Sequence, residues 1–289
     1  MRSTPQTLKF ALCTAAFALA AASTGAARAE VTDTRMLKDS VRVPGNGPPT
    51  VIVRNVNGFV HVTAYDGATV EMTATETVTG DLRADIDRAR KEWELKTESE
   101  DGRVAFRVRR VGEQGDQNNG RWNWNEGYRV KYDIEVRVPR DAAIEVNTVN
   151  DEVTVDGVRG HFDVGNVNGS MKLTGLRGSG NIKTVNGAIN AAFERAPAAG
   201  TTFKTVNGKI DVSFPQDLKA DLSFKTTHGE IYTDFDSQPV TSEPVTDRSR
   251  EGGKFVVRSG HGSAIRVGGG GPAYSFETVN GSVYIRKLK

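Results

Sequence analysis

The chain repeats one short pattern of apolar and polar positions around the dipeptide Asn-Gly, which usually follows Thr-Val. In the copy at residues 203–214, Phe203, Thr205 and Asn207 alternate with Lys204 and Val206 before the corner. After Gly208 the alternation is one of apolar with polar side chains: Ile210, Val212 and Phe214 against Lys209, Asp211 and Ser213. Alternation with a period of two is typical of a β-strand that buries one face. Each copy therefore predicts two short strands that meet at a tight corner.

The copies share their apolar positions. The residue four before the Asn position is apolar in every copy, namely Val53, Val146, Val164, Ile182, Phe203, Phe224, Val257 and Phe276. The residue three after it is also apolar, namely Val60, Val153, Met171, Ile189, Ile210, Ile231, Ala264 and Val283. The clear copies are Asn57-Gly58, Asn168-Gly169, Asn186-Gly187, Asn207-Gly208 and Asn280-Gly281, and the degenerate ones are Asn150-Asp151, His228-Gly229 and His261-Gly262.

From residue 150 to residue 228 the copies recur every 18 to 21 residues, and intervals of 33 and 19 residues follow. Self-similarity at such a period is the mark of a stacked repeat architecture. We therefore predict an all-β fold, a parallel β-solenoid of β-helix type with 18–21-residue repeats. Residues 236–253, rich in Ser, Pro, Thr, Glu and Asp, are predicted to form a loop that bulges from one turn.

Asn-Gly between alternating runs is also the strongest local signal for a β-hairpin, so a meander of antiparallel hairpins is the alternative fold. The solenoid is favoured because the frame recurs once per Asn-Gly and because residue types match from copy to copy. In either fold the dipeptide is expected to supply the positive φ that a tight corner needs.

The chain divides into three parts. Residues 1–29 are a predicted signal peptide, residues 30–140 an N-terminal β region with the first copy, and residues 141–289 the repeat solenoid. A small α/β insertion is expected near the N-terminal end: a charged helix over 81–91, strands at 103–109 and 129–138, and a Trp-rich loop over 112–127 between them. This section is a candidate cap for the open end of the stack.

The first residues are typical of secretion. Arg2 and Lys9 precede an apolar run over 10–22, and Ala27-Arg28-Ala29 is a small-residue cleavage site. The run is too short to be kept as a membrane span. Cys13, the single cysteine, is preceded by a bulky Leu where a lipoprotein signal has a small residue, so lipidation is the less favoured alternative. The mature chain is expected to be exported, to the periplasm, the cell surface or the medium, and to have no thiol chemistry.

Removing residues 1–29 also changes the charge. The whole chain has 38 Lys+Arg and 36 Asp+Glu, and the signal contains Arg2, Lys9 and Arg28 with no acid. The mature chain thus has 35 basic and 36 acidic residues, a net charge of −1, which is not the footprint of a nucleic-acid-binding protein. After Ala29 no run of apolar residues approaches the ~20 residues that a transmembrane helix needs.

Three segments carry a resemblance to a bacterial family. They are Tyr-Asp-Ile-Glu-Val-Arg-Val-Pro-Arg (132–140), Ile-Glu-Val-Asn-Thr-Val-Asn (144–150) and Val-Thr-Val-Asp-Gly (153–157), followed by several Thr-Val-Asn-Gly copies. From about residue 41 to residue 289 the chain resembles the exported "putative adhesin" family of β-repeat proteins. The resemblance implies a β-helix-like fold in the cell envelope and brings no catalytic residues with it. The chain departs from the family pattern at Asp151, His228, His261 and the Trp-rich loop.

Two rows of polar residues follow from the repeat. The corner row is expected to hydrogen-bond up and down the stack as a structural feature rather than a ligand site, and it comprises Asn57, Asn150, Asn168, Asn186, Asn207, His228, His261 and Asn280. Regular hydroxyls at Thr148, Thr184, Thr205, Thr226 and Thr278 suggest ice binding as an alternative. These threonines share a strand face with buried residues, however, so they are expected to point inward.

The best candidate for binding is the Trp-rich loop. Trp122 and Trp124 lie in a polar segment with Tyr128, and exposed aromatic side chains are costly unless they bind or pack. Such side chains stack on sugar rings and anchor protein interfaces. The structural alternative is that they fold back onto the helix or the end of the solenoid.

The sequence favours a non-enzymatic binding, adhesin-like or scaffold module without cofactor or metal, whose partner is an envelope polysaccharide or a protein. One alternative is a polysaccharide-active enzyme that uses outward acids such as Asp211, Asp221 and Asp234, although lysines at 183, 204 and 225 suggest an ordinary mixed-charge face. Another is a self-assembling structural protein. His228 and His261 lack the carboxylate or thiolate partners of a metal site.

Overall fold

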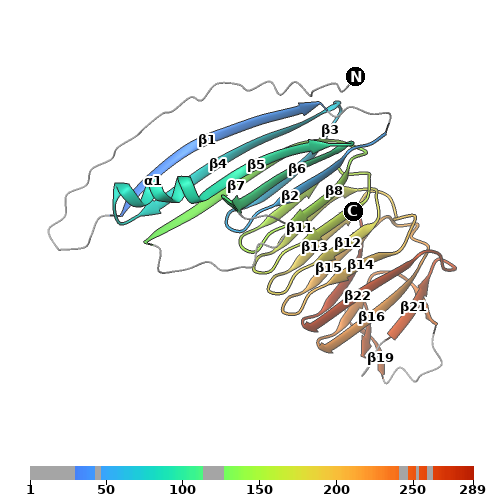
Figure 1. Ribbon diagram of the computed structural model, residues 1–289. Coiled ribbons are helices and arrows are strands. Elements are labelled where there is room, and N and C mark those ends of the chain that lie inside the picture. The colour runs from blue at the N-terminus through green and yellow to red at the C-terminus, as the bar shows by residue number, and fades with distance from the viewer. Residues whose placement is uncertain (1–29, 43–46, 113–126, 241–246, 252–253, 259–262) are drawn as a thin grey trace.

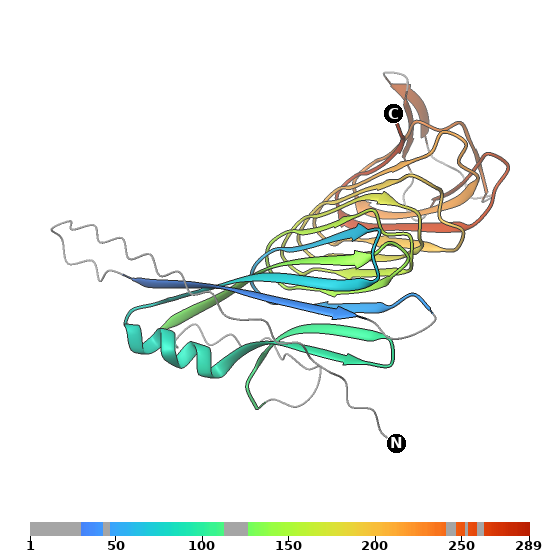
Figure 2. The same ribbon diagram turned by 90° about the horizontal axis from the view of Figure 1, so that it is seen from above.

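The computed structural model describes residues 30–42, 47–112, 127–240, 247–251, 254–258 and 263–289. Within these residues the chain forms two long β-sheets and one helix, α1 (Arg83–Glu92), as Figures 1 and 2 show. Sheet A contains, in spatial order, β1 (Val31–Arg42), β4 (Thr69–Gly80), β7 (Tyr128–Pro139), β3 (Val60–Tyr65), β9 (Val153–Asp156), β11 (Met171–Leu176), β13 (Ile189–Phe193), β15 (Ile210–Phe214), β23 (Val283–Lys287), β17 (Ile231–Thr233), β20 (Lys254–Arg258) and β19 (Asp247–Glu251). Sheet B contains β18 (Ser237–Pro239), β21 (Ser263–Val267), β16 (Ala220–His228), β22 (Ala273–Asn280), β14 (Thr201–Lys204), β12 (Gly180–Lys183), β10 (Phe162–Gly165), β8 (Ala143–Asn147), β2 (Thr50–Arg54), β6 (Arg103–Arg110) and β5 (Trp93–Glu100).

The repeat copies form a parallel stack. In each copy a strand of sheet B leads through the Asn-Gly corner into a strand of sheet A, as in β8–β9, β10–β11, β12–β13 and β14–β15. Equivalent residues of neighbouring copies lie side by side; for example, Val164 pairs with Val146 on one side and Ile182 on the other. The predicted parallel β-solenoid is confirmed, and the alternative meander of hairpins is wrong.

The N-terminal end of the stack changes from parallel to antiparallel pairing. Strands β6 and β7 add one more parallel turn beside β2 and β3. Beyond them, β5 pairs antiparallel with β6, while β4 pairs antiparallel with β7 and β1 with β4. The outermost strands at this end are therefore β1 in sheet A and β5 in sheet B.

Helix α1 lies at this end and corresponds to the helix expected over residues 81–91. The Asp85 carboxylate accepts a hydrogen bond from the backbone N–H of Leu82 at 3.0 Å, and Arg90 and Lys91 stand in the last turn, an arrangement that suits the helix dipole. Ile86 and Ala89 are buried and hold the helix against the hydrophobic core.

A buried carboxylate ties α1 to the sheet. Glu76 of β4 is fully buried and accepts hydrogen bonds from Arg35 Nη2 at 2.7 Å, Arg90 Nε at 2.9 Å and the Tyr132 hydroxyl at 2.8 Å. Burial, followed by the charge of Glu76, raises the pKa of Tyr132, so its hydroxyl stays protonated and donates. One carboxylate thus joins β1, β4, β7 and α1.

The turns do not stack in chain order at the C-terminal end. The last turn, β22–β23, lies between β14–β15 and β16–β17 (Figure 1, where red β22 lies between yellow β14 and orange β16). Strand β23 likewise pairs with β15 on one side and β17 on the other. The turn made last along the chain is therefore an interior layer of the solenoid.

The segment between these turns also differs from the prediction. Residues 236–253 were expected to be loop, yet they contain β18 and β19, and His261 was expected to be a corner of a parallel turn. The flanking strands β20 and β21 run antiparallel to β17 and β16, so this copy is not a parallel turn of the solenoid. The reason is that antiparallel strands close both sheets here, as they do at the N-terminal end. His261 itself lies outside the described residues.

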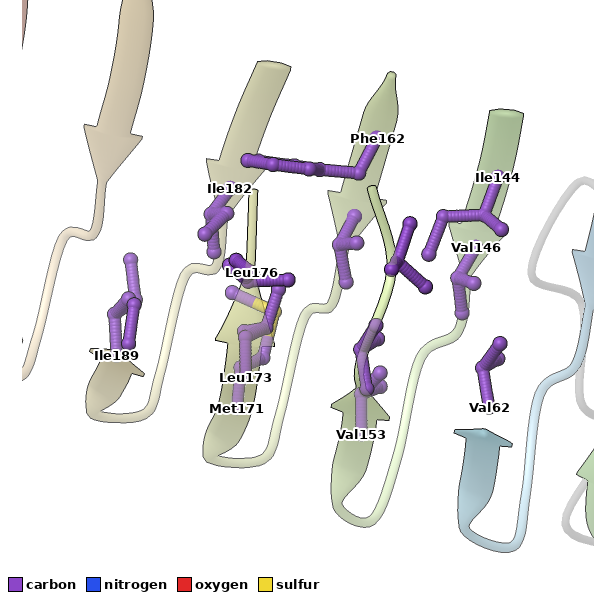
Figure 3. Close-up of a cluster of buried hydrophobic side chains, with 14 of the residues drawn as sticks. Val62, Ile144, Val146, Val153, Phe162, Met171, Leu173, Leu176, Ile182 and Ile189 are labelled. Carbon is purple, nitrogen blue, oxygen red and sulfur yellow. The ribbon is translucent and has the colours of Figure 1, made fainter. Parts of the chain in front are cut away.

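The core is the space between the two sheets. Side chains from successive turns point into it and stack along the solenoid, as Figure 3 shows for Ile144, Phe162 and Ile182 of sheet B opposite Val153 and Met171 of sheet A. Nearer the C-terminus the stack is aromatic. The Phe276 ring lies parallel to Phe203 with centroids 4.9 Å apart and to Phe224 with centroids 5.2 Å apart.

The corner glycines are required by stacking rather than by positive φ. A Cβ on Gly187 would lie 2.1 Å from the carbonyl oxygen of Gly169, and one on Gly281 would lie 2.0 Å from that of Gly208. Among the described corners, Gly58 has φ +106° and Asp151, in the degenerate copy, has φ +74°. Gly208, at φ +159°, is nearly extended, and φ at Gly169, Gly187 and Gly281 is outside the left-handed region. The expectation of positive φ at every Asn-Gly is therefore wrong. At the corners without it, glycine is needed because neighbouring turns approach too closely for any side chain.

Gly187→Ala is expected to lower the free energy of unfolding by about 1–3 kcal/mol, since the added methyl group must push two backbones apart. Urea denaturation followed by circular dichroism measures the change. Gly47→Ala is the matched control, because nothing lies within 4 Å of its Cβ position. Equal midpoints for the two variants would show that stacking does not require glycine.

Candidate functional site

An open groove of about 470 Å³ crosses the outer face of sheet B just before the corners. Its lining comes from five neighbouring strands, β2, β8, β10, β12 and β14. Because neighbouring strands are 4.7–4.9 Å apart, the groove runs about 19 Å along the solenoid axis. It is an elongated surface feature and not an enclosed cavity.

One side of the groove is a row of outward residues, one from each turn, at the last position before the corner. We call it the outer row, and within the groove it consists of Arg54, Asn147, Gly165, Lys183 and Lys204. The row continues in register beyond the groove with Glu277 and Lys225. Period-two alternation places these residues outward because the preceding residue of each strand is in the core. Gly165 has no side chain, so the row is interrupted beside Lys183.

Charges along the groove are unevenly paired. Arg54 Nη2 lies 2.5 Å from Glu145 Oε1, and Lys204 Nζ lies 2.8 Å from Glu277 Oε2. Lys183 is in register with Lys204 on the adjacent strand, so two cations stand side by side. Within the described residues Lys183 has no ion pair. Asp163 adds a carboxylate at the next outward position of β10.

The other side of the groove is apolar. From the copy at residue 150 onward the valine before the corner Asn turns outward, whereas Val56 of the first copy is buried. We call these outward residues the valine row: Val149, Val167, Val185, Val206 and Val279, of which Val167, Val185 and Val206 line the groove. Val167, Val185 and Val279 are 38%, 39% and 40% exposed. The hydrophobic core does not account for them, and together they form a narrow apolar strip beside the cations.

The corner asparagines beside this strip hydrogen-bond to one another. Each side-chain Nδ2 donates to Oδ1 of the turn on its N-terminal side, and we call this chain of contacts the amide ladder: Asn150 to Asn57 at 2.7 Å, Asn168 to Asn150 at 3.2 Å, Asn186 to Asn168 at 2.9 Å, Asn207 to Asn186 at 2.8 Å and Asn280 to Asn207 at 2.7 Å. Asn57 donates to the Val130 carbonyl at 3.3 Å. The amides are thus engaged with each other, which leaves few of their polar atoms for a ligand.

The threonine row faces inward. Thr184, Thr205 and Thr278 are at most 4% exposed and donate to glycine carbonyls of the neighbouring corner at 3.1–3.3 Å. Asn55 and Asn166 replace Thr in two copies and bond a neighbouring carbonyl in the same way, each at 2.8 Å. A flat outward hydroxyl array of the kind suited to ice is therefore absent from these positions.

The three acids considered for catalysis do not gather. Asp211 lies on sheet A and is paired with Arg286 Nε at 2.7 Å, whereas Asp221 lies on sheet B and is paired with Arg266 Nε at 2.8 Å. The hydrogen bond from Arg266 holds the pKa of the Asp221 carboxyl below its usual value. A general acid for glycoside cleavage needs a raised pKa and a second carboxylate across the bond. Asp234 accepts from the backbone N–H of Lys287 at 3.3 Å.

Tyr128, at the end of the Trp-rich loop, contacts helix α1. Its hydroxyl donates to Glu92 Oε2 at 2.6 Å, and the Arg88 guanidinium lies over its ring, 5.3 Å from the centroid. Trp122 and Trp124 lie outside the described residues. His228 is exposed, in register with Asn280. The described residues contain no group of three or more His, Cys, Asp or Glu that could hold a metal ion.

Sequence reasoning noted Lys183, Lys204 and Lys225 only as a solvated face, and it missed the groove and Gly165. A signal was available: when the copies are aligned on Asn-Gly, Gly165 falls at a position that other copies fill with a longer side chain. That the valine row faces outward could not be seen, because an apolar residue in an alternating pattern is normally assigned to the core.

Residues 133–262 match the family model described as Toastrack DUF4097. Among solved structures, the chain is similar to a "putative cell adhesion protein" from Clostridium sporogenes (12% identity, 88% of this chain and 100% of that chain covered, TM-score 0.38). It is similar to a "putative adhesin" from Bacteroides fragilis (10% identity, 88% and 97% covered, TM-score 0.37) and to a "putative lipid binding protein" from Parabacteroides distasonis (14% identity, 88% and 97% covered, TM-score 0.26). No curated protein matches the chain. The resemblance found in the sequence is confirmed.

The described residues contain no helix long and apolar enough to span a membrane.

Proposed function

We propose that the chain is a non-enzymatic binding module of the bacterial cell envelope, exported by residues 1–29, and that the groove on sheet B holds its ligand. The observation that carries the proposal is the groove itself, built from five successive turns and lined by cations on one side and exposed valines on the other. Its partner is an envelope polysaccharide or a protein. The Trp-rich loop remains a second candidate contact through Trp122, Trp124 and Tyr128.

The architecture favours binding over catalysis. Each groove strand is hydrogen-bonded to a neighbour on both sides, so the outer row keeps a fixed spacing without a ligand. Such preorganisation lowers the entropic cost of binding an extended ligand. The acids Asp211 and Asp221 lie on different sheets and are held by arginines, which disfavours the enzymatic alternative.

The ends of the stack disfavour the self-assembling alternative. An exposed parallel edge would template another chain, and proteins block edges with antiparallel, charged, short or Pro-containing strands. Asp33 and Arg35 point inward on the edge strand β1, and β18, an edge of sheet B, is three residues long and ends at Pro239. The described ends are therefore poor templates for polymerisation.

Gly165→Phe is expected to weaken the apparent affinity for envelope material at least tenfold, which corresponds to about 1.4 kcal/mol. The new side chain fills the gap in the outer row. The group closest to its Cβ is the movable Asn147 side chain, at 2.7 Å, and the Val146 carbonyl oxygen lies at an ordinary 3.9 Å. The measurement is co-sedimentation of the purified protein with fractionated peptidoglycan, outer-membrane lipid and surface polysaccharide.

Thr154→Phe is the matched control, since it places the same side chain on the outer face of sheet A. Retained binding by Gly165→Phe would contradict the groove as the contact. Loss of binding in Trp122→Ala/Trp124→Ala, with Gly165→Phe unaffected, would transfer the site to the Trp-rich loop.

A further inference from the structure

We propose that the groove selects an acidic linear polysaccharide, with a carboxylate or phosphate group at Lys183 and Lys204 and the apolar faces of its sugar rings on the valine row. This inference rests on the proposed function and names the ligand class of the same site. Four features of the groove carry it.

The first feature is the side-by-side pair of cations. Lys183 and Lys204 occupy matching positions on adjacent strands, and like charges placed directly opposite each other destabilise a sheet. On the other side of Lys204, by contrast, Glu277 lies between Lys204 and Lys225 and pairs with Lys204 at 2.8 Å. An anion held between the two ammonium groups relieves the repulsion and supplies Lys183 with a counter-charge.

The second feature is the interruption at Gly165. Gly165, the neighbour of Lys183 on β10, has no side chain, and the space that a Cβ would take there is bordered by the movable Asn147 side chain, whose Oδ1 lies 2.7 Å away. A ligand chain can therefore pass from the cation pair towards β8 when the Asn147 side chain moves aside. A longer side chain at this position would close the path.

The third feature is the carboxylate at Asp163, with the paired Glu145 beside it in register. A carboxylate accepts hydrogen bonds from sugar hydroxyls but repels a second anion. This half of the groove thus suits uncharged, hydroxyl-bearing rings. Along the groove the two lysines are thus followed by two carboxylates. This order of charges favours a polymer in which acidic units are separated by neutral ones.

The fourth feature is the shape of the apolar side. Val167 and Val185 are exposed in a strip one residue wide, which gives the flat faces of sugar rings an apolar contact but encloses no acyl chain. A lipid anchor gains its affinity by burying each methylene group, and this surface does not do so. A protein strand cannot add here either, because the groove lies in the middle of sheet B, away from any free edge.

The test is isothermal titration of the purified protein with hyaluronan oligosaccharides, in which acidic and neutral sugars alternate, and with oligogalacturonate. The unmodified protein is expected to bind at least one of them, hyaluronan more tightly. Lys183→Gln/Lys204→Gln is expected to weaken that binding by about tenfold or more, and methyl-esterified oligomers should lose a similar factor. Added salt should weaken binding as well, because the contact is exposed.

Lys172→Gln is the control, since it removes an exposed lysine from the outer face of sheet A and should leave affinity unchanged. Failure of both acidic oligomers to bind, or equal binding of their esters, would overturn the inference. So would binding to vesicles of anionic phospholipid in place of the oligomers, or inorganic phosphate competing as well as the polymer. If envelope binding is lost in Gly165→Phe but kept in the double lysine variant, the proposed function stands and its acidic ligand is refuted.

Discussion

A chain that lacks residues 272–289 is expected to lose the fold of its C-terminal region, and not merely a terminal turn. These residues form β22 and β23, which hydrogen-bond to β14 and β15 on one side and to β16 and β17 on the other. Their removal takes out a layer with four fully buried side chains, Tyr274, Phe276, Val283 and Ile285. Loss of one buried aromatic side chain alone costs about 3–5 kcal/mol, and whole domains are stable by about 5–15 kcal/mol.

Hydrogen exchange is the measurement. Protection should disappear in β16 and β17 and persist in β8 to β13, which contact neither removed strand. Deletion of residues 288–289 is the control, because it shortens the chain without touching β22 or β23. Full protection of β16 in the shortened chain would show that β16–β17 restacks on β14–β15, as the shared phenylalanine positions 203 and 224 permit.

Glu76→Ala is expected to lower the free energy of unfolding by about 3–5 kcal/mol, the cost of breaking a buried charge network by removing one partner. The variant leaves Arg35 and Arg90 without their shared carboxylate and the Tyr132 hydroxyl without its acceptor. It also releases the tie between α1 and the sheet. Urea denaturation monitored by circular dichroism gives the change directly.

Glu71→Ala is the matched control on the same strand. Its ion pair with Arg137 is exposed, at 2.9 Å, and exposed pairs contribute about 0–1 kcal/mol. If the two variants unfold at the same urea concentration, the Glu76 network does not stabilise the fold. If the Glu76→Ala protein unfolds in two steps, with α1 first, the network stabilises the attachment of the helix and not the sheet.

The solenoid could be predicted from the sequence because every copy has the same apolar positions around its corner. The order in which the turns stack could not be predicted. Phe203, Phe224 and Phe276 occupy the same position of the frame, so any of these turns can pack on any other. In the structure β20 and β21 run antiparallel beside β17 and β16, so they cover the outer side of that turn and β22–β23 lies on its inner side.

The groove could not be predicted for a different physical reason. The period of the repeat predicts which positions are buried. It does not predict the outer row, whose residues vary from copy to copy because no contact with the core constrains them. The contribution of Gly165 depends on what its neighbours on β8 and β12 present in register. The inward threonines, in contrast, could be anticipated because they share a strand face with the core.

The backbone hydrogen bonds at the Asn-Gly corners also affect how fast the asparagine side chains deamidate. Asn-Gly is the dipeptide most prone to spontaneous deamidation, in which the glycine nitrogen attacks the asparagine side-chain carbonyl. Here the N–H of Gly169, Gly187 and Gly208 donates to an asparagine carbonyl of the next turn at 2.9–3.0 Å, and the amide ladder holds each side chain in place. The glycine nitrogen is thus engaged in a hydrogen bond, and the asparagine side chain that it would attack is held by the amide ladder. We therefore expect deamidation at these corners to be slow as long as the protein stays folded.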